Sequence, residues 1–171
     1  MDREFVVFDT ETTGLYPHLG DAIIEIGALR IDKNGRELDE FQRFIHTGIP
    51  SHPDTIKIHG LSDQFIAKHG EALDKVMNDF VEFVGDTTLV GHNIRSFDMK
   101  FLNRHLLQVG LSPMENDLID TLDLSRQKLP HLGSHKLQTL ANEFGLDYSK
   151  AHRALEDVKI NAVVFLRLLM L

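Results

Sequence analysis

An apolar run that ends in two carboxylates constrains the fold of this chain more than any other stretch. Residues 5–8 are Phe-Val-Val-Phe, and Asp9 and Glu11 follow, separated by one residue. A short run of aromatic and β-branched residues predicts a buried central strand. Because side chains alternate along a strand, Asp9 and Glu11 should point to the same side of the sheet. Two such carboxylates repel each other, and a divalent cation would offset their charge, although solvated acids at a strand exit have the same pattern.

Composition limits the classes of protein that need to be considered. The chain has 171 residues, 42% hydrophobic and 26% charged, which suits one globular domain over residues 1–171. It has no cysteine and therefore no disulfide or thiolate zinc site, and we expect a cytoplasmic protein. Apolar runs such as 162–166 are too short for a bilayer, so we expect neither a membrane anchor nor a signal peptide. The net charge of −8 argues against broad binding of duplex nucleic acid, but it allows a small site at which metal ions supply positive charge.

The next segments predict an antiparallel meander. Residues 22–31 alternate, which indicates a second strand with Ile24, Ile26 and Ala28 on one side. Asn-Gly at residues 34–35 is a strong hairpin signal, and residues 36–45 return as a third strand.

Strands and helices then alternate along the chain. Two further strands are expected at residues 87–91 and 118–121. Helices are expected after Ser62 and over residues 73–84, 96–109, 122–128, 136–144 and 154–169. This order predicts an α/β fold with a central mixed five-stranded sheet and helices on both faces. The first strand should be central, and ligands should gather at the ends of the central strands.

Two later segments carry side chains that could complete a site with Asp9 and Glu11. Asp98 is expected in the first turns of a helix, where the macrodipole favours an anion, although Asp is also a common helix-start residue. Asp157 lies near the start of the last helix, and His152 precedes it by five residues. On one continuous helix the two would lie roughly 140° apart, so a loop position for His152 would let both reach one site.

These segments, taken in order, resemble the three motifs of the DEDDh, or DnaQ-like, 3′–5′ exonuclease family, whose fold is ribonuclease H-like. The resemblance spans essentially the whole chain and is greatest to the proofreading exonucleases of bacterial DNA polymerase III, through residues 9–14 and 134–137. The second motif departs from these proofreaders because three residues, not two, separate Asn93 from Phe97. Asp98 keeps its place if the turn absorbs the extra residue. The matching motifs are Asp9-x-Glu11, Asn93-x3-Phe97-Asp98 and His152-x4-Asp157.

The resemblance implies hydrolysis of phosphodiester bonds from the 3′ end of single-stranded DNA by a two-metal-ion mechanism with Mg²⁺ or Mn²⁺. It makes His152 the general base, which suits an imidazole whose ordinary pKa is about 6.5. The metal ligands that it implies are Asp9, Glu11, Asp98 and Asp157.

Further residues carry over as substrate contacts. Thr10 and Thr12 would touch the terminal nucleotide, and His59 and Asp54 would lie near it. Asn93 would order the second motif through side-chain hydrogen bonds. Phe97 would lie near the substrate or, given its spacing from Phe101, pack in the core.

Three alternatives remain open from the sequence. The same chemistry could act on RNA or short oligonucleotides, which a contact to the 2′-hydroxyl would distinguish. The fold could instead serve as a catalytically silent module that binds nucleic-acid ends or a DNA polymerase. A different metal-dependent phosphoesterase would require the three ordered motifs to be accidental.

Overall fold

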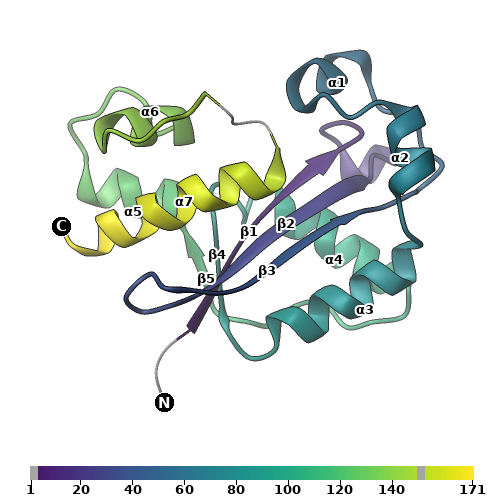
Figure 1. Cartoon of the computed structure of the whole chain (residues 1–171), viewed down its shortest axis with the longest axis horizontal. Helices are drawn as coiled ribbons and strands as arrows, with labels where there is room; N and C mark the ends of the chain where they lie inside the picture. Colours follow the sequence, from purple (N-terminus) through teal and green to yellow (C-terminus); the bar gives the residue numbers. More distant parts are fainter. Residues whose placement is uncertain (1–3, 150–152) are drawn as a thin grey trace.

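A computed structural model describes residues 4–149 and 153–171 and has one mixed five-stranded sheet, in the order β3-β2-β1-β4-β5 (Figure 1). The central strand β1 pairs antiparallel with β2 and parallel with β4, and β5 is parallel to β4. The expected fold class, with the first strand in the middle, is therefore confirmed. The strands are β1 (Glu4–Thr12), β2 (Ile23–Asp32), β3 (Glu37–Phe44), β4 (Thr88–Gly91) and β5 (Leu118–Asp120).

Helices cover both faces of this sheet (Figure 1). α3 (Leu73–Val84) and α4 (Asp98–Gln108) pack on one face, and α7 (Ala154–Leu169) crosses the other, next to α5 (Thr121–Lys128) and α6 (Leu137–Glu143). The short helices η1 (Pro17–Leu19), α1 (Pro53–His59) and α2 (Asp63–His69) lie in the connections after β1 and β3. Within the described part of the chain, every helix is too short or too polar to cross a membrane.

The alternation of β1 decides which helices each side chain meets. Val6 and Phe8 are fully buried in the cluster formed with α3 and α4. Phe5 and Val7 point the other way and pack with α7, where the rings of Phe5 and Phe165 are 5.0 Å apart. Because Asp9 and Glu11 continue the odd-numbered series, they are directed to the α7 face.

A bulge in β2 reverses one part of the predicted strand pattern. Glu11 lies opposite Glu25, but Thr12 lies opposite Ile23, so Ile24 has no partner in the register. The extra residue moves Ile23 to the side of Ile26 and Ala28 and sends Ile24 into a separate cluster with Leu61 and Ile66. The prediction that Ile24 shares a side with Ile26 was therefore wrong, because strand alternation holds only without a bulge.

Candidate active site

Three carboxylates meet where β1 passes the first turn of α7. One carboxylate oxygen each of Asp9, Glu11 and Asp157 lies within 4.8 Å of the other two. Asp9 and Glu11 are partly exposed, and Asp157 is buried. The expectation that Asp9 and Glu11 point to the same side is confirmed. Their oxygens are close enough together to share a cation.

Close contact between α7 and β2 brings Asp157 to this position. A Cβ on Gly27 would lie 2.5 Å from the main-chain nitrogen of Leu155 and 2.6 Å from the carbonyl carbon of Ala154. The first turn of α7 therefore rests directly on the backbone of β2, which only glycine permits. Val158 and Phe165 then bury the apolar stripe of the helix against the sheet. Asp157 stands in that first turn, beside the end of β1.

Asp98 approaches from the other face of the sheet and is held by β1 itself. It is the first residue of α4 and is buried. The main-chain nitrogen of Thr10 donates to its Oδ1 at 3.1 Å, and the Thr10 hydroxyl donates to the same oxygen at 2.5 Å. Thr10 points to the α4 face because it alternates with Asp9 and Glu11. Asp98 thus lies near the cluster although it comes from the opposite helix layer.

Asn93 begins the turn between β4 and α4, the segment that carries the extra residue of the second motif. Asn93 has a φ of 62°, a left-handed conformation that Asn tolerates better than most residues. Its main-chain nitrogen donates to Oδ1 of Asp120 at 2.8 Å, and its carbonyl accepts from the nitrogens of Ser96 and Phe97. The hydrogen bonds of Asn93 within the described residues therefore use its main chain, and not its side chain as expected.

Burial and mutual repulsion make the carboxylates hard to ionise. Loss of solvation, followed by the charges of Asp98 and Glu11, raises the pKa of Asp9 well above its ordinary value. Burial and then the charge of Glu25 raise the pKa of Glu11 to about 9. Burial raises the pKa of Asp98 to about 7, although the Thr10 hydroxyl opposes that rise. Such a cluster of like charges is stabilised by positive charge placed among them.

Two polar residues near this cluster carried no sequence prediction. Glu25 is fully buried directly opposite Glu11, and it is the single charged residue of the apolar stretch 22–29. That isolated charge in a buried strand was the signal that could have identified it. Tyr148 lies between α6 and α7, and burial, then the charges of Asp157 and Asp9, raise the pKa of its phenol to about 12. No local pattern marks this tyrosine.

The remaining predicted residues differ in how they meet the cluster. Asp54 is directed into solvent, with a side chain 90% exposed and 2.9 Å from the Lys57 ammonium, so the structure does not bring it to the carboxylates. The hydroxyl of Thr12 is engaged by the carbonyl of Gly14 at 2.6 Å. His59 is buried: its Nδ1 accepts from the Leu61 nitrogen at 3.0 Å, while Nε2 has no hydrogen-bond partner among the described residues.

Two predicted residues remain, Phe97 and His152. Phe97 is half-buried and packs on Phe101, with ring centroids 5.0 Å apart, as the core alternative predicted. His152 lies outside the described residues, so its role as a general base stays a prediction.

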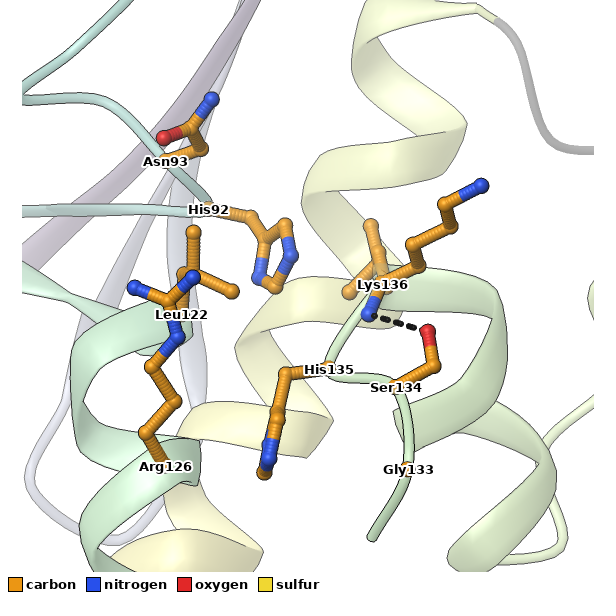
Figure 2. Close-up of a pocket in the computed structure, with 9 residues that line it drawn as sticks. His92, Asn93, Leu122, Arg126, Gly133, Ser134, His135 and Lys136 are labelled. Atoms are coloured by element: carbon orange, nitrogen blue, oxygen red, sulfur yellow. Dashed lines mark hydrogen bonds between the residues drawn. The ribbon is translucent and has the colours of Figure 1, made fainter.

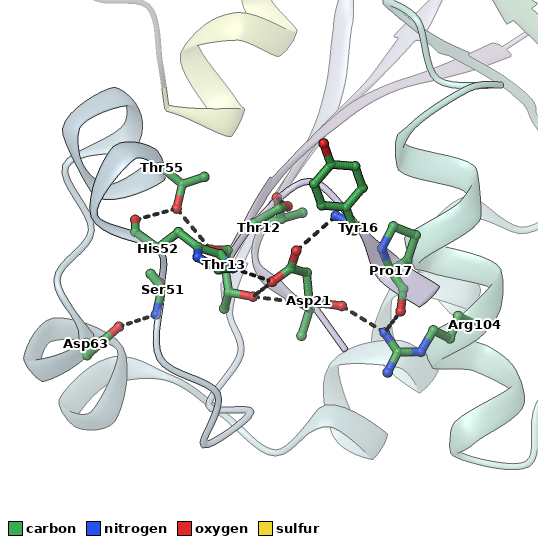
Figure 3. Close-up of polar contacts among 12 residues, drawn as sticks. Thr12, Thr13, Tyr16, Pro17, Asp21, Ser51, His52, Thr55, Asp63 and Arg104 are labelled. Atoms are coloured by element: carbon green, nitrogen blue, oxygen red, sulfur yellow. Dashed lines mark hydrogen bonds and ion pairs between the residues drawn. The ribbon is translucent and has the colours of Figure 1, made fainter. Parts of the chain in front are cut away.

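The loop after the acidic motif is held by a buried carboxylate, Asp21 (Figure 3). Asp21 accepts from the main-chain nitrogen of Tyr16 at 2.9 Å and lies 3.2 Å from Nε2 of His52. A Cβ on Gly14 would lie 2.3 Å from Oδ2 of Asp21 and 2.4 Å from the His52 ring. Gly14 is therefore required for the approach of Asp21 and His52, and this packing fixes the course of the chain after β1.

A cavity of about 510 Å³ opens beside the turn that leads to Asp98 (Figure 2). Arg126 from α5 and Lys136 from the loop before α6 contribute positive charge to its wall. His92 also lines it, and burial lowers the pKa of this imidazole, which favours the neutral form at pH 7. The cavity thus combines two cations with neutral polar groups, a lining suited to an anionic ligand.

Comparisons with known proteins place the chain among nucleases. A family model described as "Exonuclease" matches residues 6–165. The chain is 41% identical, over 93% of its own length, to the PolC-type DNA polymerase III of Halalkalibacterium halodurans. It is 40% identical, over 99% of its length, to the protein of the same description from Caldanaerobacter subterraneus. It spans only 11% and 12% of these two relatives.

Solved structures agree on the fold. The crystal structure of E. coli exonuclease I in complex with a dA16 oligonucleotide has a TM-score of 0.86 to this chain at 21% identity. A zinc-bound form of the exonuclease I complex with single-stranded DNA has the same TM-score at 22% identity. Each match covers 96% of this chain and 40% of the other. At these identities the similarity establishes the fold alone.

Proposed function

Because the chain belongs to the exonuclease family, whose model matches residues 6–165, we propose that it hydrolyses phosphodiester bonds from the 3′ end of single-stranded DNA. We propose further that residues 1–171 act as one exonuclease domain. The observation that carries the proposal is the meeting of Asp9, Glu11 and Asp157, whose oxygens lie within 4.8 Å of one another. Asp98, bound to Thr10 on the same strand, supplies a fourth carboxylate.

The donor set fits hard divalent cations. Asp9, Glu11, Asp98 and Asp157 offer only carboxylate oxygens, which Mg²⁺ and Mn²⁺ prefer, and the chain has no thiolate to favour a softer metal. The raised pKa values of Asp9, Glu11 and Asp98 support the same assignment, because bound cations would stabilise the charged forms that burial and, for Asp9 and Glu11, mutual repulsion disfavour. When bound, two such ions would stabilise the attacking and leaving oxygens of the displacement. Mg²⁺ is the ion that we propose, with Mn²⁺ as its substitute.

The protein residues have separable tasks in this proposal. His152 takes a proton from the attacking water, a task for which its ordinary pKa of about 6.5 is suited. Thr10 serves the site by holding Asp98, and its hydroxyl is engaged there. His59 presents a buried Nε2 that lacks a partner among the described residues, and we assign it a contact with the terminal nucleotide. Thr12 would contact the same nucleotide through its main chain, since its hydroxyl binds Gly14.

The cavity of Figure 2 supports an anionic polymer as the substrate. Arg126 and Lys136 line it, and Asn93 connects it to the turn before Asp98. A chain with a net charge of −8 needs local positive charge to hold a phosphodiester backbone, and these two side chains provide it. Phosphate contacts of this kind are typical of single-strand binding without sequence preference.

The relatives suggest the setting in which the activity is used. Proteins described as PolC-type DNA polymerase III carry a region similar to nearly all of this chain. The exonuclease I structures hold a dA16 oligonucleotide in one case and single-stranded DNA in another. We therefore propose DNA as the substrate, proofreading or repair as the role, and a DNA polymerase as a partner.

Digestion of 5′-labelled single-stranded DNA and matched RNA, with Mg²⁺, Mn²⁺ or EDTA, tests the proposal. We expect a metal-dependent ladder that shortens from the 3′ end, is faster on DNA, and is lost in Asp9→Asn and His152→Ala. Asp79→Asn is the matched control, because it removes the same charge from α3 on the opposite face of the sheet. Faster degradation of RNA would change the substrate class. Folded wild-type protein that degrades neither polymer would refute the enzyme and favour a binding module.

A further inference from the structure

An ion pair between a buried carboxylate and a partly exposed guanidinium lies beside the carboxylate cluster. Glu25 on β2 has a side chain with 0% exposure, and its carboxylate is 3.3 Å from Nε and 3.4 Å from Nη2 of Arg153. Nε2 of Gln42 donates to the same carboxylate at 2.7 Å. Glu25 stands directly opposite Glu11, a like-charge pair that would be unfavourable without a cation. Arg153 supplies that cation from 128 residues away in the sequence.

Arg153 stands at the start of α7, the helix that carries Asp157. It is the N-cap of α7, and its carbonyl accepts from the main-chain nitrogen of Asp157 at 3.0 Å. The location of Arg153 therefore restricts where the carboxylate of Asp157 can stand.

The side chain of Arg153 is held by two strands. Its guanidinium binds Glu25 on β2 and lies over the ring of Phe44 on β3, 5.7 Å from the ring centre. A planar guanidinium can bind a carboxylate through two nitrogens while it lies over an aromatic ring, a geometry that an ammonium does not match. Breaking such a pair would leave the buried charge of Glu25 unpaired next to Glu11. The ion pair thus joins the sheet that carries Asp9 and Glu11 to the helix that carries Asp157.

We propose that Glu25 and Arg153 are positioning residues that set the start of α7, and through it Asp157, against Asp9 and Glu11. This inference rests on the proposed exonuclease function and names two residues that act in it without touching the substrate. Their effect is on the placement of the reacting groups, where a displacement of about 1 Å costs up to roughly 100-fold in rate. Binding of the DNA strand, which uses other surfaces, is left largely unchanged.

The test compares Arg153→Met, Arg153→Lys and Glu25→Gln with the wild type. We expect Arg153→Met to lower kcat on single-stranded DNA by about 10- to 100-fold with little change in KM, and to weaken Mn²⁺ binding measured calorimetrically without DNA. Arg153→Lys should lose less activity than Arg153→Met, because the ammonium keeps the positive charge but lacks the planar guanidinium. In Glu25→Gln the new amide oxygen can still accept from Gln42, which keeps this variant foldable.

The matched control is Lys159→Met. Lys159 lies on the same helix and binds Glu40 on β3 at 2.9 Å, so its loss also removes one cation that joins α7 to the sheet. That pair is half-exposed, and such pairs contribute little. We expect its kcat and Mn²⁺ affinity to match the wild type. All rates are normalised to the folded fraction measured by circular dichroism, which separates loss of positioning from loss of folded protein.

The double variant Glu25→Gln/Arg153→Met decides whether the two residues act together. A shared task predicts a loss no larger than that of Arg153→Met alone, whereas independent residues lose activity additively. Additive losses would overturn the proposal, as would unchanged kcat and Mn²⁺ affinity in folded Arg153→Met or Glu25→Gln. If the wild type degrades no nucleic acid, the proposed function fails. The Mn²⁺ titrations then still test the positioning role of Glu25 and Arg153. They support it only if Arg153→Met binds Mn²⁺ more weakly than Lys159→Met does.

Discussion

Thr10 binds Asp98 twice, through its main-chain nitrogen at 3.1 Å and its hydroxyl at 2.5 Å. The two residues are 88 positions apart and come from the central strand and from the helix on the opposite face to α7. Both hydrogen bonds reach the same carboxylate oxygen, Oδ1. The threonine between Asp9 and Glu11 therefore links Asp98 to the strand that carries both.

Replacing Thr10 should lower the nuclease activity without abolishing it. Thr10→Val removes the hydroxyl at nearly constant volume, and loss of that hydrogen bond raises the pKa of Asp98 further, because the hydroxyl now lowers it. We expect nuclease activity to fall by about 10- to 100-fold, the usual cost of losing an outer-shell partner, and the pH optimum to move upward. Thr10→Ser keeps the hydroxyl and should retain most activity. Equal pH profiles for wild type and Thr10→Val would contradict this role.

The protein without metal should lose stability as the pH rises. Folding raises the pKa of Glu11 from 4.5 to about 9, so the folded state holds this proton more tightly than the unfolded state. The resulting contribution is complete below pH 4.5 and is lost as the pH rises towards 9. We expect the Tm in EDTA to fall over this interval more steeply for the wild type than for Glu11→Gln. A parallel decline in the two proteins would refute the shift.

Divalent cations should stabilise the folded protein by mass action. A cation that binds only the folded state adds about 2.7 kcal/mol to the free energy of unfolding at 100 times its Kd. Because the cluster must release protons to bind, the rise in Tm with Mg²⁺ should be larger at pH 8 than at pH 6. Asp9→Asn should abolish this rise, while Asp79→Asn should keep it. Scanning calorimetry at both pH values measures the effect, and a rise that persists in Asp9→Asn would place the cation elsewhere.

Gly27→Ala tests the contact that brings Asp157 to the site. The new methyl group would meet the main chain of Ala154 and Leu155 at 2.5–2.8 Å, and neither neighbour can move without shifting α7. We expect the free energy of unfolding to fall by about 1–3 kcal/mol and Mn²⁺ binding to weaken. Gly133→Ala is the control, since nothing lies within 4 Å of a Cβ added at Gly133. Urea unfolding of both variants measures the difference, and equal midpoints would show that α7 accommodates the methyl group.

Local patterns were sufficient to predict most of the fold. The mixed sheet with β1 in the centre follows from the apolar run before Asp9, the meander signals and the alternation of helices and strands that comes after them. The predicted helix after Ser62 is also confirmed: it is α2, and the Ser62 hydroxyl caps it by accepting from the Phe65 nitrogen at 3.1 Å. These features depend on residues a few positions apart, which the sequence displays directly.

Features that depend on contacts between distant segments were missed or wrong. The bulge at Ile24 follows from how β2 aligns with β1, and no residue type in the sequence predicts it. Asp54 matched a family position, and only the structure shows that its side chain is directed into solvent beside Lys57. The pairing of Glu25 with Arg153 required α7 to be placed on the sheet first.

The sequence by itself determined which side chains are available for the proposed chemistry: four carboxylates and a histidine in three ordered motifs, on strands and helices that local periodicity predicts. The tertiary structure decided what surrounds them. It engaged Thr10 with Asp98, paired Glu25 with Arg153, and set α7 against Gly27 so that Asp157 meets Asp9 and Glu11. The physical reason is that motifs and periodicity are properties of neighbouring residues, whereas these contacts join segments 88 and 128 residues apart and arise only from packing.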